Sequence, residues 1–531
     1  MSETPEFSSA AVAAPHSLAA ETGQIVLAQG GNAIEAMVAM AATAAIVCPH
    51  LNGIGGDGSW LVREPGGRLH AIDAVGAAGS LATIRRYRDK GYDAVPARGP
   101  EAAVTMAGAV PGWRLALELS KALGGKLPLD ALLADAIRHA RDGYPVSGSE
   151  ARHPLTEEAA LLAAPGFAAA CLVDGKRPPA GTIRRAVALA DTLSQLAHAG
   201  LGDFCRGDVG REIAADLERL GAPITRRDVE TCTAKVVTPL SVRVGDATVS
   251  NLSPPTQGLT SLLILGIFER LNVPPRDGSA HHHGLIEAAK RAFAVGNRVI
   301  ADADRLSDDP ASFLAAQVLE REATAIDGRR AAPFPLPGPA DGGSIWMGAI
   351  DGSGLAVSYV QSISREFGSG CVLPATGILW HDGGQSFSLD PAARSPLEPG
   401  RKPVRTLNPA LAVFDDGRVL AFGSGGGGQT QVQAQIFARH AGLGMGPADA
   451  VDAPRWLFGR SPGAERATLT VEERFDSGLL RALRDLGHEI EETDRPFVDA
   501  MGHAGMVVKH RRNGRVEAVH DPRSEGGALG L

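Results

Sequence analysis

The chain has 531 residues, of which 44% are hydrophobic and 21% charged, so its composition is that of a globular protein with a large core. The formal net charge is −8, aromatic residues make up 5%, and no run of Lys or Arg stands out. These values disfavour nucleic acid and anionic membrane surfaces as partners.

The first residues and the cysteines predict where the protein works. Residues 1–7 carry acidic side chains and no basic or apolar targeting segment, and the most apolar early stretch, Ala36 to Cys48, is too short to span a membrane. The five cysteines lack C-x-x-C spacing and are typical of reduced thiols. We therefore expect a cytoplasmic protein with no membrane segment.

The early part of the chain combines a small-residue helix with a glycine-rich turn. Asn32 is a suitable N-cap for a buried helix over residues 33–40. Residues 53–58, GIGGDG, then precede a strand over 59–62. A phosphate-binding loop is disfavoured, because the Gly-Lys-Ser/Thr ending and the strand-before, helix-after context are missing.

Between about residues 115 and 330 the apolar periodicity predicts mainly helices. The predicted helices are 129–141, 184–199, 259–271 and 284–300, and one strand is predicted over 242–251. Three histidines, 281–283, precede the last helix, and Glu287 lies one turn beyond His283. Neighbours in a run point in different directions and no third ligand is evident nearby, so we predict no metal site.

A break in the pattern lies at residues 333–343, which read PFPLPGPADGG. Alternating prolines followed by two glycines exclude a regular element. The next residues predict a β-hairpin, with strands over 344–350 and 355–360 and a turn over 351–354. Taken alone this is an ordinary linker before a strand, but a hydroxyl residue delivered to a strand's first position is also what a self-cleaving hydrolase needs.

Cleavage between Gly343 and Ser344 would give Ser344 a free α-amine beside its own hydroxyl. A weak nucleophile would then carry its own base. Glycine at position 343 lets the backbone bend so that the hydroxyl reaches the preceding carbonyl. The sequence therefore predicts Ser344 as nucleophile and, through its amine, as general base.

The second half of the chain is β-rich. The predicted strands are 377–380, 411–414, 419–422, 468–471 and 506–508. The glycine run 423–428 precedes a predicted helix over 430–441 and is either a flexible turn or an oxyanion hole, since successive N–H groups at a helix N-terminus stabilise negative charge. Helices at both ends with strands between them fit a four-layer αββα sandwich.

Arg405 and Thr406 precede a predicted strand within the segment 401–409. This segment is either a solvated loop or a carboxylate-binding element, because a guanidinium fork matches a carboxylate.

Together these residues resemble the gamma-glutamyltransferase family of N-terminal-nucleophile (Ntn) hydrolases, nearly from end to end. The motifs that carry the resemblance are GGNA at 30–33, NGIGGDG at 52–58, VPG at 110–112, EAAKRAFA at 287–294, FGSG at 367–370, TGI at 376–378 and GSGGG at 423–427. The segments 358–370, 406–409 and 453–456 resemble more closely the branch that contains oxamate amidohydrolase.

The resemblance implies an α+β, Ntn-hydrolase αββα fold and hydrolysis or transfer at an amide. It implies autocleavage into a large subunit, residues 1–343, and a small subunit, residues 344–531, that form one intertwined unit. The nucleophile falls at Ser344, where most members carry threonine, and the oxyanion hole at Gly426 and Gly427. We expect a small-molecule amide as partner and no cofactor, and the oligomeric state, a homo-oligomer included, stays open.

Several family positions are changed in this chain. The Arg that grips the substrate α-carboxylate falls at Ile84, with Arg85 one step further on. The hydroxyl that supports the nucleophile from the next strand falls at Val360, and the Asn that helps to hold the α-amino group falls at Ser362.

Two further changes concern the pocket and the junction. Residues 380–387, WHDGGQSF, replace an acidic lid segment, and Arg405 with Thr406 replaces a pair of serines. The oxamate amidohydrolase branch usually has Asp-Thr where this chain has Gly343 and Ser344. The changes predict that the glutamyl-recognition pocket is lost.

The predicted function is hydrolysis of a small anionic amide, oxamate-like or gamma-glutamyl-like, through an acyl-enzyme on Ser344. The predicted substrate-binding residues are Arg405, Thr406, Arg85 and Ser362. Two alternatives stay open: a gamma-glutamyl hydrolase or transferase acting on glutathione-type compounds, and an unprocessed, non-catalytic homologue that binds ligands.

Overall fold

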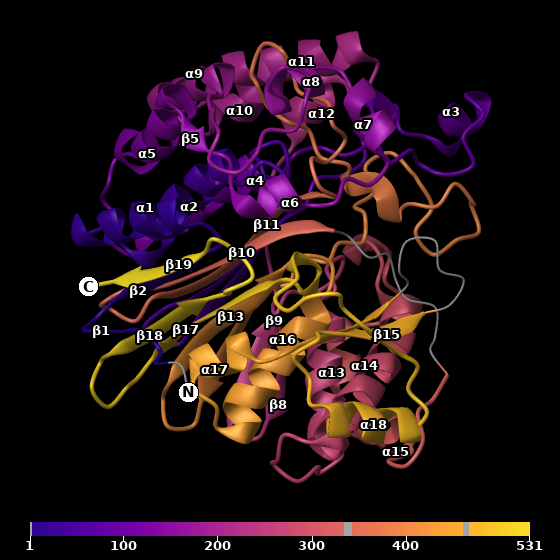
Figure 1. Ribbon diagram of the computed structural model, residues 1–531. Coiled ribbons are helices and arrows are strands. Elements are labelled where there is room, and N and C mark those ends of the chain that lie inside the picture. Colours follow the sequence, from indigo (N-terminus) through magenta and orange to yellow (C-terminus); the bar gives the residue numbers. More distant parts are fainter. Residues whose placement is uncertain (1–2, 334–341, 460–466) are drawn as a thin grey trace.

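The computed structural model describes residues 3–333, 342–459 and 467–531, so most of the Pro/Gly break before Ser344 lies outside the described residues. Two seven-stranded sheets form the centre of the molecule, with helices outside each of them (Figure 1). This is the predicted four-layer αββα arrangement.

The first sheet has the strand order β19-β2-β10-β11-β3-β4-β7. Its strands are β19 (Gly527–Gly530), β2 (Ala11–Ala14), β10 (Gly343–Ile350), β11 (Ala356–Ser364), β3 (Asp57–Arg63), β4 (Leu69–Ala74) and β7 (Lys235–Val237). The predicted hairpin after residue 343 is β10 and β11, at the middle of this sheet.

The second sheet has the order β1-β18-β17-β13-β12-β9-β8. Its strands are β1 (Glu6–Phe7), β18 (Val516–His520), β17 (His503–Lys509), β13 (Val419–Gly425), β12 (Ala410–Phe414), β9 (Ala247–Asn251) and β8 (Leu240–Val244). The remaining strands form two small sheets: β14 (Trp456–Gly459), β15 (Thr468–Val471) and β16 (Ile490–Glu492) in one, and β5 (Tyr144–Pro145) with β6 (Ile183–Arg184) in the other.

Both large sheets mix strands from before and after Ser344. The first takes four strands from before β10, and the second takes β1, β8 and β9 from the same part of the chain. Residues on both sides of the predicted boundary at 343/344 therefore contribute strands to the same two sheets.

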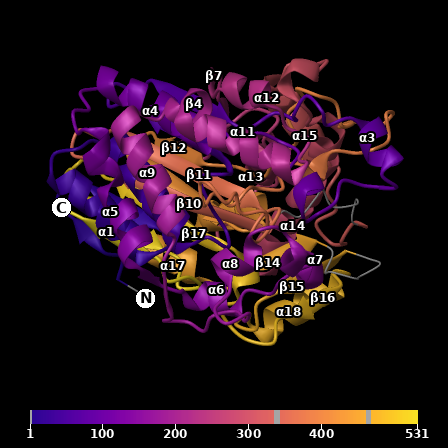
Figure 2. The same cartoon turned by 90° about the horizontal axis from the view of Figure 1, so that it is seen from above.

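One group of helices covers the outer face of the first sheet and another covers the second sheet (Figure 1). The first group comprises α1 (Ser17–Ala28), α2 (Ala33–Val47), α4 (Ala109–Ala122), α5 (Leu129–Asp142), α6 (Gly148–Arg152), α7 (Glu158–Ala163), α8 (Phe167–Cys171), α9 (Val187–Ala199), α10 (Asp203–Arg206), α11 (Asp208–Leu220) and α12 (Arg226–Thr231). Figure 2 looks down on this group, and α3 (Ile84–Asp89) lies at its edge.

The second group comprises α13 (Gly258–Arg270), α14 (Ser279–Val299), α15 (Ala316–Thr324), α16 (Gln429–Phe437), α17 (Pro447–Asp452) and α18 (Ser477–Asp485). Within the described residues, no helix is long and apolar enough to cross a membrane.

Tight packing between the two sheets depends on Trp346. Its indole donates a hydrogen bond to Ser358 Oγ at 2.9 Å. A Cβ atom added at Gly423 or Gly505 would lie 2.1 or 2.3 Å from the indole ring, so these strands approach closely only because they carry glycine there. The strand that begins at residue 343 is therefore packed closely, through Trp346, against β13 and β17 of the second sheet.

Most predicted elements are confirmed, including α2, whose N-cap Asn32 forms a capping box with Glu35. Two are wrong. Residues 242–251 form the two strands β8 and β9, because Gly245 has φ +54° and turns the chain between them. Residues 377–380 are not a strand and make only isolated bridges, Val372 with Leu379 and Gly55 with Trp380.

Candidate active site

Ser344 lies near the start of β10, at an irregularity in its pairing with β11. Gly343 pairs with Ser364 and Ile345 with Gln361, so the register shifts at Ser344. The extra residue lies on β11, where residues 362 and 363 face Ser344, and bulges of this kind are common beside active sites. Ser344 is 1% exposed in this intact chain.

The Ser344 hydroxyl is held close to the peptide bond that precedes it. Its Oγ lies 2.7 Å from the Gly343 carbonyl oxygen and 3.0 Å from Ser362 Oγ. Ser362 also donates to the Gly343 carbonyl and accepts from the Ser364 N–H at 2.8 Å. Two hydroxyl groups thus converge on the carbonyl that self-cleavage would attack.

The hydroxyl that bonds Ser344 Oγ belongs to Ser362, whereas the family pattern predicts a supporting hydroxyl at position 360, which is Val in this chain. The two residues share one face of β11, since side chains alternate along a strand. Val360 pairs with Trp346 and is buried in the core between the sheets, so it offers only apolar contact. The period of two along β11 is the signal that could have identified Ser362 as a neighbour of Ser344; its predicted contact with substrate stays a prediction.

The glycine run lies against Ser344. β13 ends at Gly425, and the Gly426 N–H donates to the Ser344 carbonyl at 3.2 Å. Gly426 has φ +86°, and a Cβ added at Gly425 would lie 2.3 Å from the Ser344 carbonyl oxygen. Glycine is therefore required by both backbone conformation and space. Gly427 follows in the turn before α16, so the predicted strand, glycine turn and helix are all present.

Asp57 extends the site to the next strand. It pairs with Ser362 across β3 and β11, so the two side chains lie on the same face. Asp57 Oδ1 accepts from the N–H groups of Gly76 at 2.9 Å and Gly108 at 3.3 Å, which fix the carboxylate. Asp57 Oδ2 lies 3.4 Å from Arg405 Nε and 3.5 Å from His381 Nδ1.

Arg405 is the predicted anion-binding residue, and the structure buries it beside Asp57. Arg405 is 2% exposed. Its backbone N–H donates to the Pro255 carbonyl at 3.0 Å, and its carbonyl accepts from the Gln257 N–H at 2.8 Å. Thr406 follows it and is also buried. The contact of Arg405 with Asp57 was not predictable, because a contact between residues so far apart in sequence arises only in the folded chain.

Arg85 lies elsewhere, at the outer edge of the molecule on α3 (Figure 1). Its side chain is 88% exposed and pairs with Asp89 at 3.4 Å. In the described part of the chain no hydrogen bond or ion pair joins Arg85 to Ser344, Arg405 or Asp57. Its role in substrate binding stays a prediction to which the structure adds no contact.

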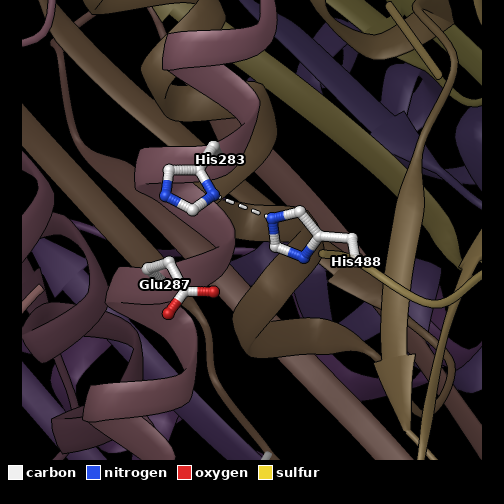
Figure 3. Close-up of side chains that lie close together, drawn as sticks. All are labelled: His283, Glu287 and His488. Atoms are coloured by element: carbon white, nitrogen blue, oxygen red, sulfur yellow. Dashed lines mark hydrogen bonds between the residues drawn. The ribbon is translucent and has the colours of Figure 1, made fainter. Parts of the chain in front are cut away.

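A second buried polar cluster lies on α14, and we call it the α14 cluster: His283, Glu287, Lys290 and His488 (Figure 3 shows all but Lys290). His488, which follows α18, supplies the third potential metal-ligand residue, which the sequence spacing did not reveal. Ligand atoms of His283, Glu287 and His488 all lie within 4.8 Å of one another.

Apart from His488 Nδ1, the polar side-chain atoms of the α14 cluster have partners among the described residues. Glu287 accepts from Lys290 Nζ at 2.7 Å and from the Ala332 N–H at 3.1 Å. His283 bonds the Asp327 carbonyl at 2.9 Å and His488 at 2.8 Å. A divalent cation here would face the Lys290 ammonium and would add uncompensated charge to a buried site. We assign this cluster a structural role and no metal.

The αββα sandwich is the architecture of the Ntn hydrolases, and the protein is an enzyme of that class. The sequence model of the family described as gamma-glutamyltranspeptidase matches residues 19–531. The chain belongs to the gamma-glutamyltranspeptidase family.

Individual relatives match this chain over almost its whole length. The chain is 46% identical to the oxamate amidohydrolase proenzyme of Klebsiella pneumoniae, over 97% of each chain. It is 32% identical to the glutathione hydrolase-like YwrD proenzyme of Bacillus subtilis, over 98% of each. The crystal structure of cephalosporin acylase from Bacillus halodurans matches with a TM-score of 0.89 and 28% identity, covering 100% of this chain and 97% of that one.

Proposed function

We propose that this protein is a self-processing amidohydrolase that hydrolyses a small anionic amide through an acyl-enzyme on Ser344. The observation that carries the proposal is the approach of the Ser344 hydroxyl to the Gly343 carbonyl, 2.7 Å between the oxygens, with Ser362 bonded to both. A positioned, buried hydroxyl beside the peptide bond on its own N-terminal side supports self-cleavage, because the nucleophile is already held next to its target.

Self-cleavage would proceed by an acyl shift. Ser344 Oγ attacks the Gly343 carbonyl carbon, the Gly343–Ser344 C–N bond breaks, and the hydroxyl proton passes to the nitrogen. Water then hydrolyses the Gly343 ester. The products are a chain that ends in the Gly343 carboxylate and a chain that begins with Ser344, which has its hydroxyl and a free α-amine. These are the large and small subunits, 1–343 and 344–531.

The mature site would use the same groups on substrate. The Ser344 amine accepts the hydroxyl proton as Oγ attacks the amide carbon, and it returns that proton to the departing amine. The N–H groups of Gly426 and Gly427 stabilise the oxyanion; what supports this role is the position of the glycine turn against Ser344. Water then deacylates Ser344 and releases a carboxylate.

Arg405 supports an anionic substrate. It lies beside Asp57, which is the cross-strand neighbour of Ser362, and Ser362 bonds Ser344, so a short chain of contacts links the guanidinium to the nucleophile. A compact amide that carries its carboxylate near the reacting carbonyl fits this layout. The oxamate amidohydrolase relative is named for such a compound.

A cytoplasmic location is part of the proposal. It is supported by the five cysteines, which are all free thiols in the structure.

The experiment is a hydrolysis assay on the processed protein with oxamate, a gamma-glutamyl anilide and neutral oxamide. Release of ammonia from oxamate in preference to oxamide is the expected result. Preference for the gamma-glutamyl anilide would instead favour a gamma-glutamyl hydrolase or transferase, the activity suggested by the YwrD relative's name. An intact, inactive chain would contradict both activities.

A further inference from the structure

Three buried polar atoms meet around Asp57, the cross-strand neighbour of Ser362, which bonds Ser344. Among the described residues, Asp57 Oδ2, His381 Nδ1 and Arg405 Nε have no hydrogen-bond partner, although the first lies 3.5 and 3.4 Å from the other two. All three residues are 2% exposed or less. Leaving a buried polar atom unpaired costs about 1–3 kcal/mol, so three such atoms close together offer groups that a ligand or a proton can satisfy.

The proton on His381 can be located from its other ring nitrogen. His381 Nε2 lies 3.0 Å from the Thr105 carbonyl oxygen, which can only accept, so Nε2 carries a hydrogen. In the neutral ring Nδ1 then has a lone pair, and that lone pair faces a carboxylate oxygen of Asp57. A second proton, on Nδ1, would convert this repulsion into an attractive contact.

The charges around His381 balance in its neutral form. Arg405 and Asp57 lie together and cancel, and Asp382 lies 3.9 Å from the Arg365 guanidinium. Asp57, Arg405 and Asp382 act electrostatically on the His381 ring, and Arg365 reaches it through Asp382. The site therefore has no net positive charge to offer an entering anion, and burial of an uncompensated charge is strongly unfavourable.

We propose that His381 takes up a proton on Nδ1 when the substrate carboxylate binds at Arg405, so that anion binding is linked to protonation. The inference rests on the proposed amide hydrolysis at Ser344 and deepens it, since it predicts which charge state accepts the substrate. His381 is thus a positioning residue: its proton bonds Asp57 and leaves the Arg405 charge available to the ligand.

The resting state of His381 agrees with this order of events. Burial lowers the pKa of His381 below its usual value, against the opposing influence of Asp57. The ring is therefore neutral near pH 7 before a ligand binds. A second carboxylate in the pocket raises the pKa, because nearby negative charge favours the imidazolium.

The test is calorimetric titration of the processed enzyme with oxalate, a dicarboxylate that cannot be hydrolysed as an amide. Titrations in phosphate and in Tris separate proton uptake from binding heat. We expect uptake of about one proton per oxalate near pH 7.5, and an affinity that weakens about tenfold for each pH unit above that value. The substitution His381→Gln keeps a donor for the Thr105 carbonyl, and it should abolish the uptake.

His488→Gln is the matched control, because it removes another buried histidine that lies in the α14 cluster. It should leave the uptake unchanged. Oxalate binding without proton uptake, or uptake that persists in His381→Gln, would overturn the inference while leaving amide hydrolysis intact. Absence of oxalate binding to enzyme that has cleaved at Gly343–Ser344 would overturn the anion pocket and this inference, but not self-cleavage.

Discussion

The site cluster of Asp57, His381 and Arg405 and the α14 cluster are both buried and both contain histidine, a carboxylate and a cation. They differ in how their polar atoms are used. In the site cluster one atom from each residue lacks a hydrogen bond, whereas Glu287 and His283 bond protein partners through both of their polar atoms. In the α14 cluster His488 Nδ1 is the exception.

The difference shows how a functional cluster can be told from a structural one. A network that serves the fold is satisfied within the protein, because each unpaired group costs stability. A network that serves a ligand leaves groups ready for it. For the α14 cluster, the hydrogen bonds of the residues are thus a better guide to function than the presence of residue types that can bind a metal.

The largest expected effect is the loss of self-cleavage and of amide hydrolysis when Ser344 is replaced. Ser344→Ala removes the only oxygen that can attack the Gly343 carbonyl from this side chain, so cleavage should stop and amide hydrolysis should fall by about 10⁴-fold or more. Intact mass and ammonia release measure the two effects. Ser344→Thr keeps the hydroxyl and is the control; hydrolysis by the Ala variant at the wild-type rate would remove Ser344 from the mechanism.

Substitutions in the α14 cluster should have the opposite effect: they should lower stability without lowering the rate of amide hydrolysis. Lys290→Met leaves the Glu287 carboxylate buried without its cation, and the free energy of unfolding should fall by about 3–5 kcal/mol. Urea unfolding measures this, and activity per folded molecule should not change. The double variant with Glu287→Met should regain part of the loss, and an equal loss in both variants would show that the ion pair is not the cause.

A smaller effect is expected from the hydroxyl that supports the nucleophile. Ser362→Ala removes the hydrogen bond to Ser344 Oγ, and self-cleavage should slow by about 10- to 100-fold, followed by intact mass over time. Ser362→Thr should restore most of the rate. The matched control is Ser364→Ala, on the same strand, because the Ser364 hydroxyl has no hydrogen-bond partner among the residues that the structure describes. Equal slowing by both Ala variants would contradict the role of Ser362.

The smallest effect is on pH-dependent stability. Burial, with Lys290 and His283, lowers the pKa of His488 to about 3, below the value of about 6.5 in an unfolded chain. Between these values the unfolded state binds the extra proton, so stability is full above pH 6.5 and falls as the pH drops, by up to about 1.4 kcal/mol per unit. Thermal unfolding from pH 7 to 5 should be less pH-dependent in His488→Gln; an unchanged slope would count against a neutral His488.

The local pattern of the sequence predicts the elements around Ser344 well. The hairpin, the glycine run and the following helix each depend on residues close together in the chain, so spacing and turn chemistry are sufficient. The break at Gly245 was missed because a two-residue turn inside an apolar run leaves the alternation almost unchanged.

The contacts of the site could not be predicted in the same way. Asp57, His381 and Arg405 come from three distant segments, and His488 reaches the α14 cluster from a fourth. Such contacts depend on tertiary packing. The hydroxyl that bonds Ser344 belongs to Ser362 and does not lie at the family position, which is Val360. This depends on the register of β10 and β11 and on its bulge, and these are properties of the paired strands.

The most direct test of the central claim is to incubate the purified wild-type protein, separate its chains on a denaturing gel and measure their intact masses. The account predicts two chains, residues 1–343 and 344–531, with Ser344 as the new N-terminus. A single stable chain of 54.9 kDa, or cleavage at another bond, would contradict it.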